Sequence, residues 1–271
     1  SSFLIPVDSA KVLNNGIVKE YQVDRLLKSV VWEYERGEMY KNNLAVMDMI
    51  GTNGWERPFY FASTVPPSNY MGLEDYFQLE GLAYRIAPLD STGTKTQDIG
   101  FVDTRQMYNN LMNKFKWGNA SDPGVYLDEN NRRMFSNFRR MFGMLAEALI
   151  VEGDTSRARE VLYRSMEEIP QYQLDHDYYS INLFNALYRI GEVEMALEIA
   201  NEIITNSRQY LDLVMQLDGP RRYDLDYVIG LNMQSMISLY NMSLDLGIDE
   251  MVAEIEQDID RYYNELFMRP R

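Results

Sequence analysis

Two patterns of hydrophobic and polar positions divide the chain. In about the first hundred residues, short apolar and aromatic runs alternate with Gly- and Pro-containing turns, which is typical of strands and short helices. Beyond residue 105 the apolar residues recur every three or four positions, which predicts helices. We therefore predict an α+β fold, with an α/β module at residues 1–104 and a helical-repeat module at residues 105–271.

The first half offers one clear strand and one clear helix. KSVVWEY (Lys28 to Tyr34) is β-branched and aromatic, so it predicts a strand. NNLAVMDMIGTNG predicts a helix that Asn42 or Asn43 caps and that Gly51 and Gly54 end. The apolar positions of this helix are Leu44, Val46, Met47 and Ile50.

The aromatic-rich segment that follows predicts further strands. RPFYFAST reads as a strand buried on both faces. GLEDYFQLEGLAYRIAP predicts a short helix, a break at Gly81 and a strand at residues 82–87. The order of strands and helices favours a small, partly parallel α/β layer, whose strand order the sequence does not fix. DSTGTKTQDIG (Asp90 to Gly100) predicts a polar surface loop.

The second half contains a helical repeat. FGMLAEALIVEGDTSRAREVLYRSMEEIP resembles a tetratricopeptide repeat, in which two antiparallel helices approach through small residues. Gly153 separates the two helices, and Pro170 stops the second one. The positions expected to face inward are Phe142, Leu145, Ala146, Leu149, Ala158, Leu162 and Ser165.

Two further copies follow with departures from the pattern. The second starts near Ser180, but Phe184 stands where a small residue belongs and Arg208 where Pro belongs. Its matching positions are Leu183, Leu187, Gly191, Ala196 and Ala200. The third keeps only Gly247 and Val252, after an insertion around MQLDGPRRYD. Three hairpins are about the minimum for a stable helical stack.

The net charge and the absence of Cys exclude several classes of function. The net charge of −15 argues against nucleic acid and against a basic face that docks on anionic lipid. With no Cys, thiolate nucleophiles, disulfides and Cys-based zinc sites are excluded. No apolar run is long enough to span a membrane, and no signal peptide is visible, so we expect no direct membrane insertion by this segment. The chain also begins without Met, which is expected of an excised piece or processed form.

Two groups of residues invite a catalytic or metal-binding interpretation. Glu74, Asp75 and Glu80 could supply the paired carboxylates of a glycoside hydrolase, although Glu74 and Asp75 would point apart on a helix. His176, the only His, lies between Asp175 and Asp177. One His with two carboxylates is a weak metal site, so we expect a loop between repeats, with one Asp capping the next helix. We predict no catalytic residue, metal or cofactor for this chain.

The corner at Trp55 to Pro58 has a binding and a structural interpretation. Trp55 could stack on a sugar or chain and Arg57 could hold an anion, or both could pack a turn that leads into a buried strand. The candidate residues for binding a ligand or partner are Trp55, Arg57, Tyr60, Tyr76, Gln78, Glu80 and Tyr84.

Several runs resemble the C-terminal region of a membrane-protein family. They are NGWERP, QLEGLAYR and DENNRR, within a likeness that extends from about Phe3 to the third hairpin. The family is a multi-pass group of unknown function, common in Bacteroidetes, whose membrane half resembles protein O-mannosyltransferases and whose tail ends in tetratricopeptide-like helices.

The resemblance implies a location and a role. The chain would be a non-catalytic domain on the extracytoplasmic (periplasmic) side of the inner membrane, whose partners are the membrane-embedded half of the same protein and a polypeptide acceptor. The parent protein, rather than this chain, would be the glycosyltransferase. The alternatives are an independent tetratricopeptide scaffold that binds a peptide or protein, and the paired-carboxylate glycoside hydrolase.

Overall fold

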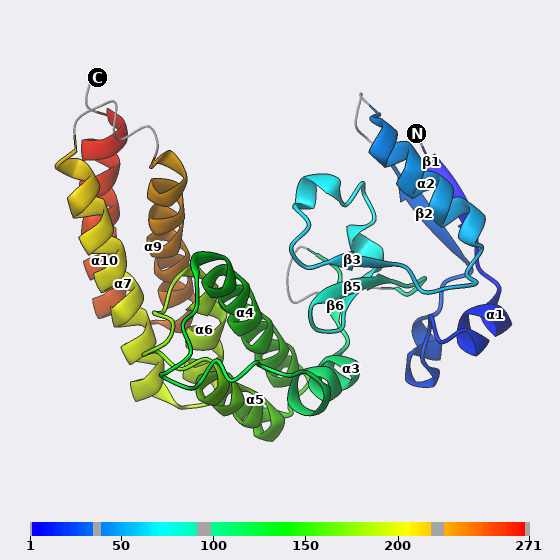
Figure 1. The fold of residues 1–271 in the computed structure, drawn as a ribbon, viewed down its shortest axis with the longest axis horizontal. Helices are drawn as coiled ribbons and strands as arrows, with labels where there is room; N and C mark the ends of the chain where they lie inside the picture. The colour runs from blue at the N-terminus through cyan, green and yellow to red at the C-terminus, as the bar shows by residue number, and fades with distance from the viewer. Residues whose placement is uncertain (1, 35–38, 91–98, 218–224, 269–271) are drawn as a thin grey trace. The chain divides into compact units, whose positions relative to one another are not determined.

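The computed structural model describes residues 2–34, 39–90, 99–217 and 225–268 (Figure 1). It consists of two compact units, Ser1–Phe115 and Lys116–Arg271. The first unit mixes strands with short helices, and the second is helical, so the predicted α+β class is confirmed. The sequence placed the module boundary after residue 104, and helix α3 (Thr104–Asn109) lies between that position and the end of the first unit.

A two-stranded sheet opens the first unit. Strand β1 (Ser2–Pro6) pairs antiparallel with β2 (Ser29–Glu33), and helix α1 (Ser9–Asn14) lies between them in the chain. The predicted strand at residues 28–34 is confirmed as β2. Strand β1 was not predicted, because its residues are largely exposed and lack a clear alternation.

A four-stranded sheet follows with the order β3-β5-β4-β6. Its strands are β3 (Tyr60–Ala62), β4 (Phe77–Leu79), β5 (Ala83–Ile86) and β6 (Phe101–Val102). Strand β5 pairs antiparallel with both β3 and β4, whereas β4 pairs parallel with β6. The partly parallel layer is thus confirmed, although only one of the described pairs is parallel.

Two predicted strand segments need correction. The run at residues 57–64 forms only the three residues of β3, where Phe61 is buried but Tyr60 is 46% exposed, so the strand is not buried on both faces. The predicted short helix in GLEDYFQLE is only a 3₁₀ turn (Glu74–Tyr76), and the chain then enters β4. The reason is burial, because all three β4 residues lie inside the sheet. The break at Gly81 is confirmed.

Helix α2 (Lys41–Asn53) begins earlier than predicted. Its N-cap is Tyr40, whose backbone N–H donates to the Oδ1 atom of Asn43 at 3.1 Å, so Asn43 supports the cap from the first turn. Gly51 lies inside the helix, and only Gly54 ends it, in the left-handed conformation. Leu44 is exposed, whereas Ile50 is buried.

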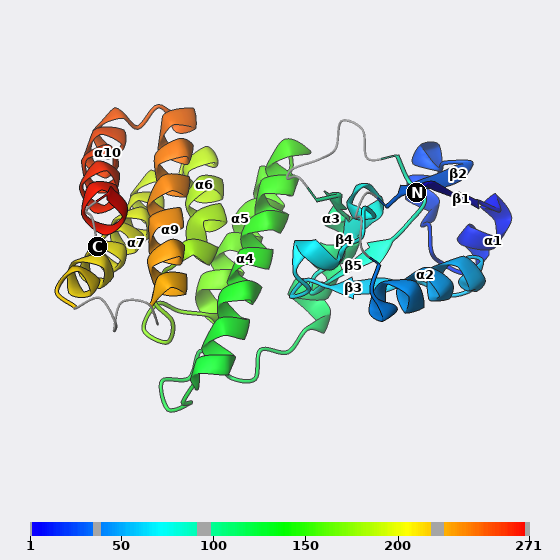
Figure 2. The ribbon, with the colours of Figure 1, turned by 90° about the horizontal axis from the view of Figure 1, so that it is seen from above.

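The described part of the second unit contains three helical hairpins (Figure 2). The first pairs α4 (Glu129–Val151) with α5 (Thr155–Glu168), and the second pairs α6 (Ile181–Arg189) with α7 (Val193–Met215). The third pairs α9 (Asp226–Leu246) with α10 (Asp249–Tyr263). In the described part of the chain, no helix is both long and apolar enough to cross a membrane.

The positions that carried the repeat pattern are confirmed as core. All seven inward-facing positions predicted for the first hairpin are buried, as are Leu183, Leu187, Ala196 and Ala200 of the second. Gly153, Gly191 and Gly247 each follow the first helix of a hairpin with φ of 83°, 88° and 71°, a conformation that favours glycine. The hairpins are therefore shown, and their tetratricopeptide type stays a prediction.

The two departures from the repeat pattern have structural reasons. Phe184 is fully buried in the core. Arg208 lies within α7, which continues to Met215 because no Pro stops it. Its guanidinium contacts Asp258 at 2.6 Å and Glu254 at 2.7 Å, so it joins α7 to α10. The predicted loop at residues 90–100 and the insertion at residues 215–224 lie for the most part outside the described residues.

Because α4 packs closely on α6, adding one methyl group at their contact should lower the stability of the helical unit. A Cβ atom at Gly143 would lie 2.6 Å from the Cβ of Asn182 and 3.0 Å from the backbone of Leu183. Gly143→Ala should therefore lower the free energy of unfolding of the helical unit by about 1–3 kcal/mol, measured by urea unfolding with far-ultraviolet circular dichroism.

Gly230→Ala is the matched control, because Gly230 lies within α9 and nothing is within 4 Å of its added Cβ. That substitution should stabilise by up to about 1 kcal/mol, since alanine favours a helix. Equal effects of the two substitutions would contradict the close approach of α4 and α6.

Candidate functional site

A buried arginine organises the polar interior of the first unit. Arg85 on β5 is fully buried and donates from Nη1 to the backbone carbonyls of Gly16, at 3.0 Å, and of Ile17. Its Nε lies 2.8 Å from Glu80 Oε1, and its Nη2 lies 3.6 Å from Asp103 Oδ2. One cation thus pairs with two buried carboxylates and holds a loop at the same time.

Amide and hydroxyl groups complete this Arg85 cluster. Gln78 Oε1 accepts from Arg85 at 3.0 Å and from Gln22 at 2.7 Å. The hydroxyl of Tyr60 donates to Glu80 at 3.1 Å, and burial together with that carboxylate raises the pKa of Tyr60 to about 12. The Tyr21 hydroxyl donates to Asp103 at 2.8 Å, and its pKa is also raised, first by burial. Both tyrosines therefore remain protonated donors at neutral pH.

The structure brings together only three of the seven candidate binding residues, namely Tyr60, Gln78 and Glu80. Tyr76 instead donates its hydroxyl to Val31 O at 2.8 Å and accepts from Val31 N at 3.0 Å, which closes the free edge of β2. Tyr84 stacks on Phe77 with centroids 5.3 Å apart. Both side chains thus support the sheets.

Trp55 and Arg57 lie in the turn that leads to β3. The indole of Trp55 is buried and donates to Pro6 O at 2.8 Å, while its own carbonyl accepts from Asn15 at 2.9 Å. Arg57 is exposed, and its backbone N–H and carbonyl both bond to the Asn53 side chain. The small cavity that both residues line has a volume of only about 10 Å³. The turn is therefore held by hydrogen bonds between side chains and the backbone.

The three carboxylates of the hydrolase interpretation lie in two places. Glu80 belongs to the Arg85 cluster, where its Oε1 forms an ion pair with Arg85 and its Oε2 accepts from Tyr60. Glu74 and Asp75 line a surface cavity of about 380 Å³ together with Glu33. Glu80 is not among the residues that line that cavity.

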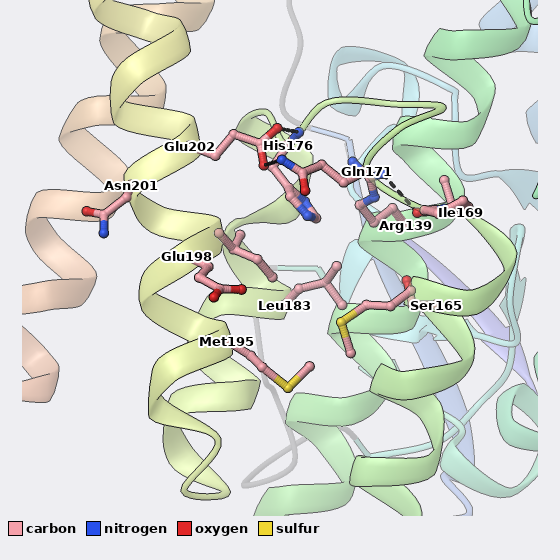
Figure 3. A pocket seen from close by; sticks show the side chains of 13 residues that line it. Arg139, Ser165, Ile169, Gln171, His176, Leu183, Met195, Glu198, Asn201 and Glu202 are labelled. Carbon is pink, nitrogen blue, oxygen red and sulfur yellow. Dashed lines mark hydrogen bonds between the residues drawn. The ribbon is translucent and has the colours of Figure 1, made fainter. Parts of the chain in front are cut away.

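The helical unit holds a larger cavity, which sequence reasoning missed. It lies between α5 and α7, has a volume of about 520 Å³, and is bordered by the segment between α5 and α6 (Figure 3). We call it the α5–α7 groove. Its apolar lining includes Met166 of α5, Leu183 of α6, and Met195 and Ile199 of α7, together with Ile169 and Pro170.

A second buried arginine holds the segment that borders the groove. Arg139 of α4 is fully buried, and its Nη1 and Nη2 atoms donate to three backbone carbonyls of that segment. The acceptors are Ile169 O at 3.0 Å, Leu174 O at 2.7 Å and Asp175 O at 2.8 Å. Burial lowers the pKa of Arg139 to about 10, so the guanidinium stays charged at neutral pH.

His176 lies in the segment between the first two hairpins, as predicted, and Asp177 caps the 3₁₀ turn that follows by accepting from Tyr179 N at 3.0 Å. The His176 backbone N–H donates to Glu202 Oε1 at 2.9 Å, and its Nδ1 lies 3.0 Å from Ser180 Oγ. Burial, and secondarily the charge of Arg139, lowers the pKa of His176 to about 3, so the imidazole is neutral. Within the described residues no group of His and carboxylates could hold a metal ion.

No simple motif in the sequence marks this groove. Arg139 looks like one more charge in the run NFRRMF, and its burial follows from the turn of α4 that faces residues 169–175. The one available signal was a helical stripe, because Met195 and Ile199 alternate with Glu198 and Glu202 along α7. That stripe indicates a groove only once α5 and α7 are known to be neighbours.

Removing the charge of Arg85 should destabilise the first unit. Arg85→Met leaves Glu80 and Asp103 buried without their cation, which should cost about 3–5 kcal/mol of unfolding free energy. Urea unfolding followed by tryptophan fluorescence, with Trp117→Phe as the common background, restricts the signal to the two tryptophans of the first unit.

The matched control is Arg57→Met, because the side chain of Arg57 is exposed. That substitution should change the unfolding free energy by less than about 0.5 kcal/mol. A loss of less than 1 kcal/mol at Arg85, a rough threshold for a dispensable pair, would contradict the structural importance of the cluster.

The state of His176 can be measured directly, because it is the only His of the chain. Its imidazole NMR signal should not titrate between about pH 5 and 8 in the folded protein, and should titrate near 6.5 in urea. A depressed folded-state pKa means that the contribution of His176 to stability is present above about pH 6.5 and is lost as the pH falls toward 3. A midpoint near 6.5 in the folded protein would contradict the burial described here.

Comparison with known proteins finds one similarity, which covers the first part of the chain. Residues 1–106 match the family model described as TMEM260-associated domain 2. The chain matches no curated protein and no solved structure. The matched segment contains both sheets and stops before the helical hairpins. The match to residues 1–106 is consistent with the resemblance to an O-mannosyltransferase-like membrane-protein family.

Proposed function

We propose that this chain is a non-catalytic, extracytoplasmic domain of a glycosyltransferase-like membrane protein and that it helps to bind a polypeptide acceptor. The observation that carries the proposal is the combination in one chain of a TMEM260-associated domain with a helical unit that has an open groove. Its partners would be the membrane-embedded half of the parent protein and the acceptor. The periplasmic side of the inner membrane is the location that this role requires.

The chemistry of the first unit supports a packing role for its charged groups. The carboxylates of Glu80 and Asp103 are already engaged by Arg85, Tyr60 and Tyr21. A general acid or nucleophile needs to reach its substrate, whereas these groups bond to one another inside the unit. Their arrangement stabilises the domain that matches the family.

The chemistry of the second unit supports binding. Stacked helical hairpins present extended surfaces that suit a polypeptide in an open conformation. The α5–α7 groove adds an apolar floor, and carboxylates and amides at its edge supply polar partners. Such a surface could hold an acceptor while a sugar is transferred by another part of the parent protein.

The proposal is tested with the whole chain and a defined probe. We expect a fluorescein-labelled, uncharged peptide rich in Ser, Thr and Ala, with a few apolar residues, to bind with a Kd on the order of 10–100 μM by fluorescence anisotropy. A folded globular protein with the same label and no net charge is the control, and it should not bind.

Equal binding of the peptide and the folded control, or no binding of the peptide in the millimolar range, would contradict a polypeptide-binding role. Hydrolysis or transfer of a sugar by the purified chain alone would contradict its non-catalytic assignment. These two results are independent, so each part of the proposal can fail separately.

A further inference from the structure

The floor of the α5–α7 groove suits a flexible apolar chain. Met166 of α5 and Met195 of α7 both line the groove, and Leu183 and Ile199 add further apolar surface. Methionine side chains adapt their shape to what they contact. An unbranched aliphatic stem would bury apolar area against all four residues without requiring one fixed shape.

Negative charge dominates the edge of the same groove. Glu198 and Glu202 project from α7 one helical turn apart and both line it (Figure 3). Glu202 accepts from His176 N at 2.9 Å and from Gln171 Nε2 at 2.7 Å, so its carboxylate is held in place. Glu198 is exposed, and no ion pair of Glu198 is found among the described residues.

The two basic side chains that line the groove do not offset this charge at its edge. Arg139 is fully buried, and its guanidinium is occupied by the carbonyls of the segment between α5 and α6. His176 is buried and uncharged at neutral pH. A ligand that enters from solvent therefore meets two carboxylates and no accessible cation of the groove lining.

A buried hydroxyl gives an independent sign that the groove accepts a polar group. Ser165 of α5 is fully buried and lines the groove, and its Oγ has no hydrogen-bond partner among the described residues. A buried hydroxyl without a hydrogen-bond partner lowers stability. A donor group that reaches it from the groove would remove that cost.

We infer that the α5–α7 groove binds a lysine or arginine side chain of an extended polypeptide. The aliphatic stem lies on Met166, Leu183, Met195 and Ile199, and the cation lies at the carboxylates of Glu198 and Glu202. Long basic side chains combine an apolar stem with a charged end, which is the combination that this groove presents. The inference rests on the proposed function, because it names the side chain by which an acceptor polypeptide would be held.

Three labelled peptides separate this inference from the general role. They are identical except at the central position, which is lysine, norleucine or glutamate. Norleucine keeps the stem and lacks the charge. By fluorescence anisotropy with the whole chain, we expect lysine to bind at least about fivefold more tightly than norleucine and glutamate to bind most weakly, with the lysine preference shrinking at high salt.

Two variants on α7 test whether the preference for lysine comes from Glu198. Glu198→Gln should reduce the lysine preference to about twofold or less and leave norleucine binding unchanged. Glu194→Gln is the control, since Glu194 is exposed one turn away on α7, lies outside the groove and loses the same charge. Glu194→Gln should keep the lysine preference. Thermal unfolding of both variants verifies that each remains folded.

The possible results distinguish the preference for a basic side chain from polypeptide binding in general. Equal binding of the lysine and norleucine peptides would overturn the inference and leave a polypeptide-binding role intact. Equal effects of Glu198→Gln and Glu194→Gln would also overturn it, because the preference would then come from the general negative charge of the chain. Failure of all three peptides to bind would overturn the inference, and failure of the uncharged Ser/Thr-rich peptide as well would remove the proposed function.

Discussion

One fully buried arginine in each unit holds irregular backbone in place. Arg85 and Arg139 are the two largest fully buried residues in the described part of the chain, and each donates to backbone carbonyls of a loop. A buried guanidinium is costly unless its donors are satisfied, so the loop must adopt the conformation that satisfies them. In the first unit this fixes residues 16–17 against β5, and in the second it fixes residues 169–175 against α4.

The two buried arginines are stabilised by different partners. Arg85 is paired with the carboxylates of Glu80 and Asp103, so the first unit contains a buried cluster of charged groups that contact one another. Arg139 bonds mainly to backbone carbonyls. The carboxylate of Glu202 therefore accepts a hydrogen bond from the His176 backbone in the same segment, and it also lines the groove. The first arrangement stabilises a domain, whereas the second also shapes a surface.

Features that depend on local residue spacing could be predicted from the sequence, whereas features that depend on contacts between distant segments could not. The periodicity of the first two hairpins was enough to place their core, because apolar spacing on a helix needs no partner to be recognised. Strand β4 was read as part of a helix, because its burial depends on β5 and β6 on either side. The burial of Arg139 and the groove beside it depend on α4, α5 and α7 being neighbours, which no residue spacing states. Of the candidate binding residues, Tyr60, Gln78 and Glu80 lie together around Arg85, a residue that the sequence analysis did not single out.

The central claim is that Arg139 keeps the border of the groove formed before any ligand arrives. Hydrogen–deuterium exchange of the His176 amide, which donates to Glu202, tests it most directly. The account predicts slow exchange, comparable to the amides of α5, and a marked acceleration at His176 in an Arg139→Lys variant whose helices stay protected. Rapid exchange at His176 in the unmodified protein, or unchanged protection in Arg139→Lys, would contradict it.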